Sequence, residues 1–139
     1  MLSSSREFEL EAEKKIDFLG TARVAIGWLH FADGFINLKH VQKLQTIFRK
    51  DCQRIDVHNH VPAVIDPQHL ARALREVNIS ANVLPKIVVK DIPILEFWPG
   101  FQLECLHGKH RIKAAKDVLS SSDAWWIVDF YSSSENNNA

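Results

Sequence analysis

The run of residues 125–131 constrains the fold more than any other segment of the chain. It reads Trp-Trp-Ile-Val-Asp-Phe-Tyr, so six of its seven residues are aromatic or β-branched. Such a run favours a β-strand that is buried in a sheet. Trp125 and Trp126 are adjacent and therefore point to opposite faces of that strand, which leaves one of them exposed or at an interface. We therefore predict a domain whose core is built around this strand.

Three segments have the periodicity of amphipathic helices, namely 38–48, 67–77 and 109–119. Asn37 is suited to cap the first helix, and the pair Asp66-Pro67 is suited to begin the second. Lys39, Lys43 and Lys50 are expected on the exposed face of the first helix. The residues expected to face the core are Leu38, Val41, Leu44, Ile47 and Phe48, then Leu70, Ala73, Leu74 and Val77, and finally Ile112, Ala115 and Leu119.

Strand-like patterns lie between these helices. Val24, Ile26 and Trp28 alternate with smaller or polar residues and predict a strand that starts at Arg23 and ends at Asp33-Gly34. Further extended segments are predicted at 55–65, 86–89, 92–98 and 101–107. The turn Trp98-Pro99-Gly100 predicts that the last two of these form a hairpin. The whole pattern predicts an α/β (α+β) fold, a compact mixed sheet with about three helices.

The two ends of the chain differ from its middle. The chain has 139 residues, 46% of them hydrophobic, which is the size of one ordinary domain with a single core. We predict an N-terminal extension at 1–20, the domain at 21–131, and a disordered Ser- and Asn-rich tail at 132–139. Residues 7–19 alternate like a strand but have the composition of a helix, and we predict a helix there.

Composition limits the partners and the compartment. Seventeen basic and seventeen acidic residues cancel, so any contact with DNA would use a local basic patch only. No apolar run is long enough to cross a bilayer, and no cleavable leader is recognisable, so we expect no membrane partner. Cys52 and Cys105 have no metal-ligand or disulfide-framework spacing and are expected to be reduced thiols. These features predict an intracellular protein, cytoplasmic or nuclear.

The segment 105–116 is the strongest candidate for a functional site. A strand ends there, Gly108 turns the chain, and a helix starts with Lys109, Arg111, Lys113 and Lys116 before any acidic residue. Cations at a helix N-terminus are unfavourable by a few tenths up to about 1 kcal/mol each, because the unpaired N–H groups already carry positive charge. Exposed N–H groups, a glycine and forked Arg donors are what a phosphate requires. The alternative is a solvated basic face with a plain turn.

The same residues carry a resemblance to a known superfamily. His107-Gly108-Lys109-His110-Arg111, followed by Ala114-Ala115, resembles the nucleotide-phosphate motif of the sulfiredoxin and ParB N-terminal domains. Residues 61–64, Val-Pro-Ala-Val, resemble a ParB strand that runs beside the phosphate loop. The stretches 54–66 and 103–131 are similar to a family of uncharacterised filamentous-fungal proteins that share this motif.

The resemblance implies a set of site residues. Gly108, His110 and Arg111 match the phosphate-binding positions, and His107 and Lys109 flank them. Asn59 or His60 is expected to line the pocket, because the strand that follows them at 61–64 runs beside the phosphate loop in the superfamily. Lys109 stands where sulfiredoxins have their cysteine and cannot act as the attacking thiolate, so sulfiredoxin activity is not expected.

Two further patterns in the sequence concern nucleotide hydrolysis and metal binding. The ParB motif Glu-Asn-x-x-Arg is not matched by residues 135–137, so nucleotide hydrolysis is not implied. His58, His60, Cys105 and His107 could in principle converge on zinc. We nevertheless assign no metal site, since a polar residue at a strand end is more often bonded to backbone.

Three hypotheses follow, in this order. The first is a ParB-type module that binds a nucleotide triphosphate with Mg²⁺ and switches association with DNA or with a second copy of the chain. The second is a phosphoryl-transfer or nucleotide-hydrolysing enzyme that uses the same pocket, for which no catalytic residue can be assigned. The third is a protein-interaction domain that keeps the fold without a ligand.

Overall fold

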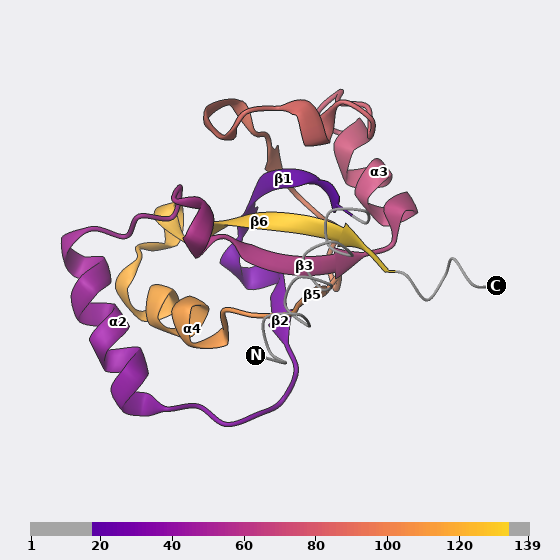
Figure 1. The fold of residues 1–139 in the computed structure, drawn as a ribbon. Helices are drawn as coiled ribbons and strands as arrows, with labels where there is room; N and C mark the ends of the chain where they lie inside the picture. Colours follow the sequence, from indigo (N-terminus) through magenta and orange to yellow (C-terminus); the bar gives the residue numbers. More distant parts are fainter. Residues whose placement is uncertain (1–17, 134–139) are drawn as a thin grey trace, which may run out of the picture.

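The computed structural model describes residues 18–133, which form one six-stranded mixed sheet with three α-helices (Figure 1). The strands are β1 (Phe18–Ala25), β2 (Leu29–Phe31), β3 (Val61–Ile65), β4 (Ile94–Leu95), β5 (Leu103–Cys105) and β6 (Trp125–Ser132). The helices are α2 (Leu38–Lys50), α3 (Pro67–Arg75) and α4 (Lys109–Val118). The order of strands across the sheet is β2-β5-β3-β6-β1-β4. This arrangement confirms the predicted fold class.

Strand β6 lies inside the sheet, as its composition predicts. It pairs antiparallel with β1, where Trp126 lies opposite Val24, and parallel with β3, where Val128 lies opposite Val61. Trp126 and Val128 are fully buried, whereas Trp125 on the opposite face remains partly exposed. Both neighbours of β6 come from distant parts of the chain, so this strand joins the two halves of the sheet.

One face of the sheet and the apolar sides of α3 and α4 form the core. Strand register places Val24, Val61 and Trp126 on that face. Leu74 of α3 and Ile112 of α4 belong to the same buried cluster. Helix α2 packs against α4, and the two lie at the opposite end of the domain from α3 (Figure 1).

The predicted helix caps form. The Asn37 side chain accepts a hydrogen bond from His40 N at 3.1 Å, and Asp66 accepts one from Gln68 N at 2.9 Å with Pro67 as the first helical residue. The expected buried residues of α3 and α4 are largely confirmed, namely Leu70, Ala73, Leu74, Ile112 and Ala115.

The prediction of buried residues was wrong at three other apolar positions. Leu38 and Ile47 of α2 are 64% and 49% exposed. Helix α2 packs on α4, and within it only Val41 is fully enclosed, so its apolar stripe is broader than its contact. Val77 is exposed because α3 has already ended at Arg75.

Several strand predictions also differ from the structure. The segment 23–33 is interrupted by a 3-10 turn at Ile26–Trp28, which lets the chain leave β1 and reach β2 at the far edge of the sheet. A 3-10 turn at Val57–Asn59 likewise replaces the first half of the strand predicted at 55–65. The strand predicted at 86–89 is absent from the described chain, where 3-10 turns occur at Leu84–Lys86 and Val89–Asp91.

The predicted hairpin at 92–107 does not form. Phe101 N donates to Trp98 O at 3.1 Å, so the turn itself exists. However, β4 pairs with β1 at one edge of the sheet and β5 pairs with β2 and β3 near the other. Phe97, Trp98 and Phe101 instead pack their rings together, and Trp98 and Phe101 also contact His69 of α3. Burial of these rings outweighs the local hydrogen bonds of a hairpin.

The strands at the two ends of the described chain extend beyond residues 21–131, since β1 starts at Phe18 and β6 ends at Ser132. Phe18 and Leu19 belong to β1, so the helix predicted at 7–19 is wrong at those two residues, and 7–17 lie outside the described residues. Ser132 ends β6 and Ser133 N donates to Ile65 O at 3.1 Å, so the ordered chain extends past 131. Residues 134–139 also lie outside the described range. Within residues 18–133, no helix has both the length and the apolar character needed to cross a membrane.

Candidate anion-binding site at the start of helix α4

Gly108 fixes the start of α4 against the sheet. Its φ of +99° lies in the left-handed region that favours glycine, and its carbonyl accepts the first helical hydrogen bond, from Ile112 N at 2.9 Å. A Cβ atom at this position would lie 2.9 Å from Cγ2 of Val61, a fully buried residue of β3. The residue must therefore be glycine both for its backbone angle and for the close approach of the two segments.

Arg111 carries an unneutralised charge beside this glycine. One of its terminal nitrogens lies 3.8 Å from the position that a Gly108 Cβ would occupy. Burial lowers the pKa of Arg111, yet a guanidinium stays protonated at neutral pH. Among residues 18–133, no hydrogen bond or ion pair engages its side chain. The structure thus holds a partly desolvated guanidinium with no acceptor.

Lys109 and His110 are placed differently from Arg111. Lys109 Nζ donates to the carbonyl oxygens of Ala32 and Gly34 at 3.0 and 3.3 Å. His110 Nε2 accepts a hydrogen bond from Asn37 N at 2.9 Å. The two side chains therefore hold the loop at 32–37, which we call the β2–α2 loop, against the first turn of α4.

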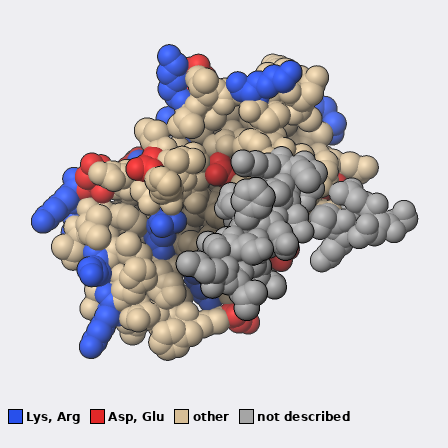
Figure 2. All heavy atoms as spheres, viewed as in Figure 1, with Lys and Arg blue, Asp and Glu red and all other residues tan. Residues whose placement is uncertain are grey.

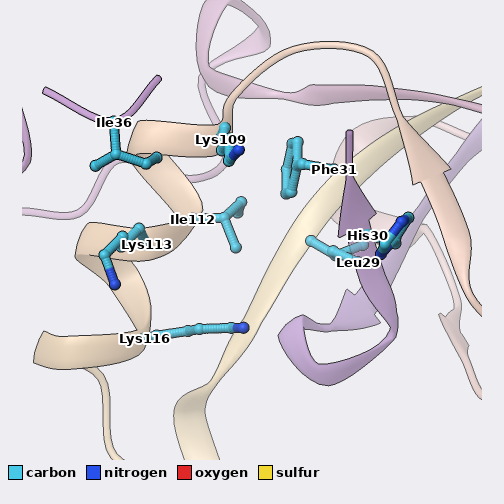
Figure 3. Close-up of a pocket in the computed structure, with 8 residues that line it drawn as sticks. All are labelled: Leu29, His30, Phe31, Ile36, Lys109, Ile112, Lys113 and Lys116. Carbon is cyan, nitrogen blue, oxygen red and sulfur yellow. The ribbon is translucent and has the colours of Figure 1, made fainter. Parts of the chain in front are cut away.

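Two open cavities flank the first turns of α4. One, of about 320 Å³, faces α2, and the other, of about 390 Å³, lies between α4 and β2 (Figure 3). Both include Lys109, and Figure 3 shows Lys116 extending from α4 toward β2. The first cavity is lined by His40, Leu44, His107, Gly108, Lys109, His110 and Arg111, and the second by Leu29, His30, Phe31, Ile36, Lys109, Ile112, Lys113 and Lys116.

The charge in these cavities has one sign. Their described linings contain four Lys or Arg residues and no Asp or Glu. Acidic and basic residues are equal in number over the whole chain, so this separation is local. In Figure 2, Lys and Arg side chains are spread over the visible face of α2 and α4. Both cavities are therefore positive and suited to an anion.

Most of the predicted site residues come together. His107, Gly108, Lys109, His110 and Arg111 all line the 320 Å³ cavity. Asn59, in contrast, is not among the residues that line either cavity. Its side chain donates to Gln53 O at 3.0 Å and its carbonyl accepts from Trp126 Nε1 at 2.7 Å. The 3-10 turn at 57–59 directs it toward these partners.

Sequence reasoning missed a polar cluster inside the sheet. The buried His60 ring places Nδ1 3.0 Å from Asp129 Oδ1 and Nε2 3.0 Å from Ile55 O, and Thr21 Oγ1 donates to the same Asp129 oxygen at 2.7 Å. Burial alone would lower the pKa of His60, but the hydrogen bonds and charge of Asp129, with the Ile55 carbonyl, raise it above its usual value. Both ring nitrogens face acceptors, so the ring joins Asp129 of β6 to the turn at Ile55 and offers no free base.

Polar Asp129 within the apolar run of β6 was the one sequence signal for this cluster. Its partner His60 lies 69 residues away in the chain, so spacing could not identify it.

The described residues also bear on metal and thiol chemistry. Among residues 18–133, no group of three or more His, Cys, Asp or Glu side chains is arranged to hold a metal ion, so the His58, His60, Cys105 and His107 set is not assembled. Cys52 and Cys105 are free thiols, as predicted. Burial raises the pKa of Cys105 to about 12, so it is a neutral thiol packed in the core.

Comparison with known proteins identifies the family. The family model described as "Protein of unknown function (DUF3723) N-terminal domain" matches residues 17–139. The chain belongs to this family. No curated protein and no solved structure matches the chain. The start of β1 at Phe18 lies next to the first matched residue, so the DUF3723 N-terminal domain includes all six strands of the sheet.

Proposed function

We propose that this DUF3723 N-terminal domain binds a nucleotide through its phosphates at the first turns of α4. One observation carries the proposal, namely that the described linings of the two cavities contain Lys and Arg residues but no carboxylate. The resemblance of residues 107–111 to the ParB and sulfiredoxin phosphate motif supports the same position.

The local electrostatics favour an anion. The backbone N–H groups of Lys109, His110 and Arg111 precede the first helical hydrogen bond of α4, and N–H groups at this end of a helix have no helical partner. They add to the positive charge of Lys109 and Arg111. A phosphate at this point would accept from both backbone and side chains, and Arg111 could donate two parallel hydrogen bonds to it.

The second cavity suits the remainder of a nucleotide. Its wall between β2 and α4 is apolar at Leu29, Phe31 and Ile112, which would accept a base or sugar, while Lys113 and Lys116 would contact further phosphates (Figure 3). Lys109 lines both cavities, so a ligand bound in either one would contact it. Mg²⁺ would be expected to arrive with the triphosphate, whose oxygens it binds.

Binding would also act on the β2–α2 loop. Lys109 Nζ now donates to Ala32 O and Gly34 O, and a phosphate would compete for those donors. Exchange of these partners would leave the bond from Asn37 N to His110 Nε2 as the remaining contact between the loop and α4 and would so loosen the loop. This coupling is the physical basis of a ParB-type switch, in which the bound state changes association with DNA or with a second copy of the chain.

The test is thermal unfolding with CTP, ATP, GTP or inorganic sulfate, each with and without Mg²⁺. A ligand at a hundred times its dissociation constant adds about 2.7 kcal/mol, which corresponds to roughly 5–10 °C for a domain of this size. Arg111→Gln should remove most of the shift. Arg75→Gln, which changes an exposed cation on α3, should keep it. The proposal fails if no nucleotide shifts the midpoint, or if Arg111→Gln responds like the wild type.

A further inference from the structure

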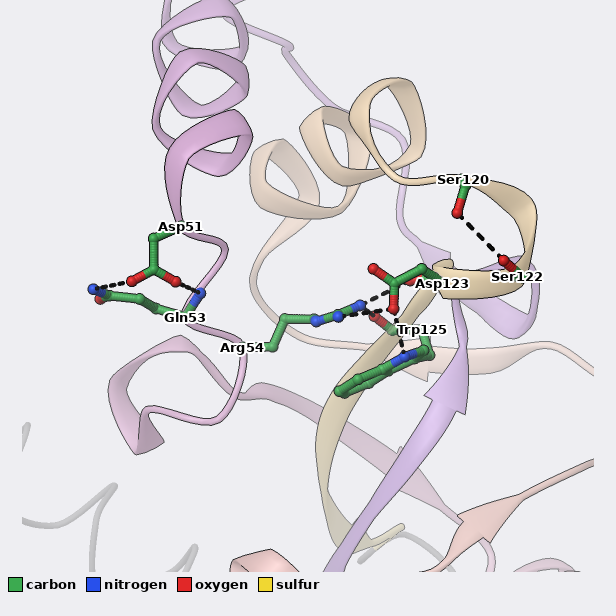
Figure 4. A network of polar contacts seen from close by, with 7 residues as sticks. All are labelled: Asp51, Gln53, Arg54, Ser120, Ser122, Asp123 and Trp125. Carbon is green, nitrogen blue, oxygen red and sulfur yellow. Dashed lines mark hydrogen bonds and ion pairs between the residues drawn. The ribbon is translucent and has the colours of Figure 1, made fainter.

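Another cavity lies at the β1–β4 edge of the sheet, and Trp125 is one of the residues that line it. Trp125 Nε1 donates to Asp123 Oδ1 at 3.1 Å, and the Arg54 guanidinium lies 3.6 Å from the centre of the indole ring (Figure 4). Arg54 in turn donates to Asp123 O and Trp125 O at 2.8 and 3.0 Å and pairs with the Asp123 carboxylate at 3.0 Å. The indole is therefore held in place, and the charge of Arg54 is neutralised.

Arg23 of β1 packs on the same ring without such partners. Its guanidinium carbon lies 4.5 Å from the Trp125 ring centre. Its Nε atom is buried and has no hydrogen-bond partner, and within residues 18–133 no hydrogen bond or ion pair engages its terminal nitrogens. Buried polar groups in native proteins are nearly always paired. Stacking on an aromatic ring orients this guanidinium but leaves its donors unused.

Arg23 lines a small cavity of about 230 Å³. Glu96 lines the same cavity but makes no ion pair with Arg23. The volume lies below the roughly 300 Å³ at which sites for drug-sized molecules begin, so the cavity fits a small metabolite. The apolar part of the lining is Ala25, Trp28, Ile94, Leu95, Ala124 and the Trp125 ring, and the polar part is Arg23, Glu96, Ser121 and Ser122.

We propose that this cavity binds a free apolar α-amino acid. The Arg23 guanidinium would pair with the carboxylate in a forked geometry, and Glu96 would accept hydrogen bonds from the ammonium group. The apolar wall between Trp28 and Trp125 would take the side chain. A zwitterion satisfies both unpaired charges at once, which neither a simple anion nor a simple cation can do.

The test uses L-phenylalanine as the probe and titration calorimetry as the readout. 3-Phenylpropionate lacks the ammonium group, and L-phenylalaninamide lacks the carboxylate. Loss of a charge-assisted hydrogen bond should weaken binding by about 10- to 100-fold. We expect the amide to bind the wild type that much more weakly, and Arg23→Gln to bind L-phenylalanine equally weakly. Glu96→Gln should lose the preference for L-phenylalanine over 3-phenylpropionate.

A second readout guards against a variant that does not fold. The Arg Nε–H signal of Arg23, assigned by its loss in Arg23→Lys, should shift on addition of L-phenylalanine to the wild type. Arg23→Lys keeps the charge but not the fork and should also bind more weakly. Arg75→Gln serves as the control and should bind normally. Unchanged affinity in both Arg23 variants, an unmoved Nε–H signal, or absence of binding at millimolar concentration would overturn the proposal.

Discussion

Replacement of Gly108 by alanine should destabilise the domain through two separable effects. The φ of +99° disfavours any residue with a Cβ atom, at a cost of roughly 1–2 kcal/mol. The added Cβ would also meet Val61 Cγ2 at 2.9 Å, and overpacking of a core costs roughly 1–3 kcal/mol. The sum is about 2–5 kcal/mol, a large part of the roughly 5–15 kcal/mol that stabilises a typical domain.

Two other glycines separate these effects by urea unfolding. Gly100 has a φ of +85° but open space around its Cβ position, so Gly100→Ala should show the backbone cost alone. Gly27 has neither a positive φ nor a neighbour within 4 Å, so Gly27→Ala should change the free energy of unfolding by less than about 0.5 kcal/mol. In a double-mutant cycle, Val61→Ala should recover part of the loss in Gly108→Ala. Equal costs at Gly108 and Gly100, with no coupling to Val61, would refute the reasoning.

Three further predictions concern other parts of the domain. The pKa of His60 is raised in the folded state, so the stabilisation that its protonated ring provides is complete below the unfolded pKa of about 6.5 and is lost as the pH rises through the folded pKa. Urea unfolding from pH 5.5 to 8.5 should therefore show that the wild type is more stable than Asp129→Asn by an amount that shrinks with rising pH. A difference that stays constant with pH would contradict this. Asn37→Ala removes the cap of α2 and should lower the free energy of unfolding by about 1 kcal/mol, whereas an unchanged denaturation midpoint would mean that the cap contributes nothing. Cys105 has a pKa of about 12 and a buried side chain, so it should not react with a thiol reagent at neutral pH until the chain unfolds. The pKa of Cys52 is also raised by burial, so Cys52 should react slowly. Rapid labelling of both thiols in the native protein would show that this packing is wrong.

Local signals predicted the elements, and non-local contacts decided how they are arranged. Asn37, Asp66-Pro67 and Gly108 act through their immediate neighbours, so the starts of all three helices could be predicted. The apolar run of β6 indicated burial from composition alone. The turn at Trp98-Pro99-Gly100 also forms, yet the hairpin does not, because the neighbouring rings pack with α3.

The candidate site was predictable to the same degree. Residues 107–111 are contiguous, so one turn of chain brings them to one cavity. The bonds of Lys109 and His110 to the β2–α2 loop span more than 70 residues and have no sequence signal. Pairing of His60 with Asp129, and of two guanidinium groups with Trp125, likewise depends on strand order. Side chains brought together by the sheet were therefore the ones that sequence reasoning missed.

The strand order has a consequence for how the domain is made. None of the described strands pairs with the strand next to it in the sequence, so the sheet contains no hairpin that could form early. High sequence separation between contacting strands slows folding. The pair β1–β4 and the trio β2–β5–β3 can each assemble first, but only β6 connects them, and β6 is the last of the described strands to leave the ribosome. During synthesis, the sheet therefore cannot be completed until residues 125–132 have emerged, and until then the two partial sheets have exposed apolar edges. A chaperone is most needed in this interval.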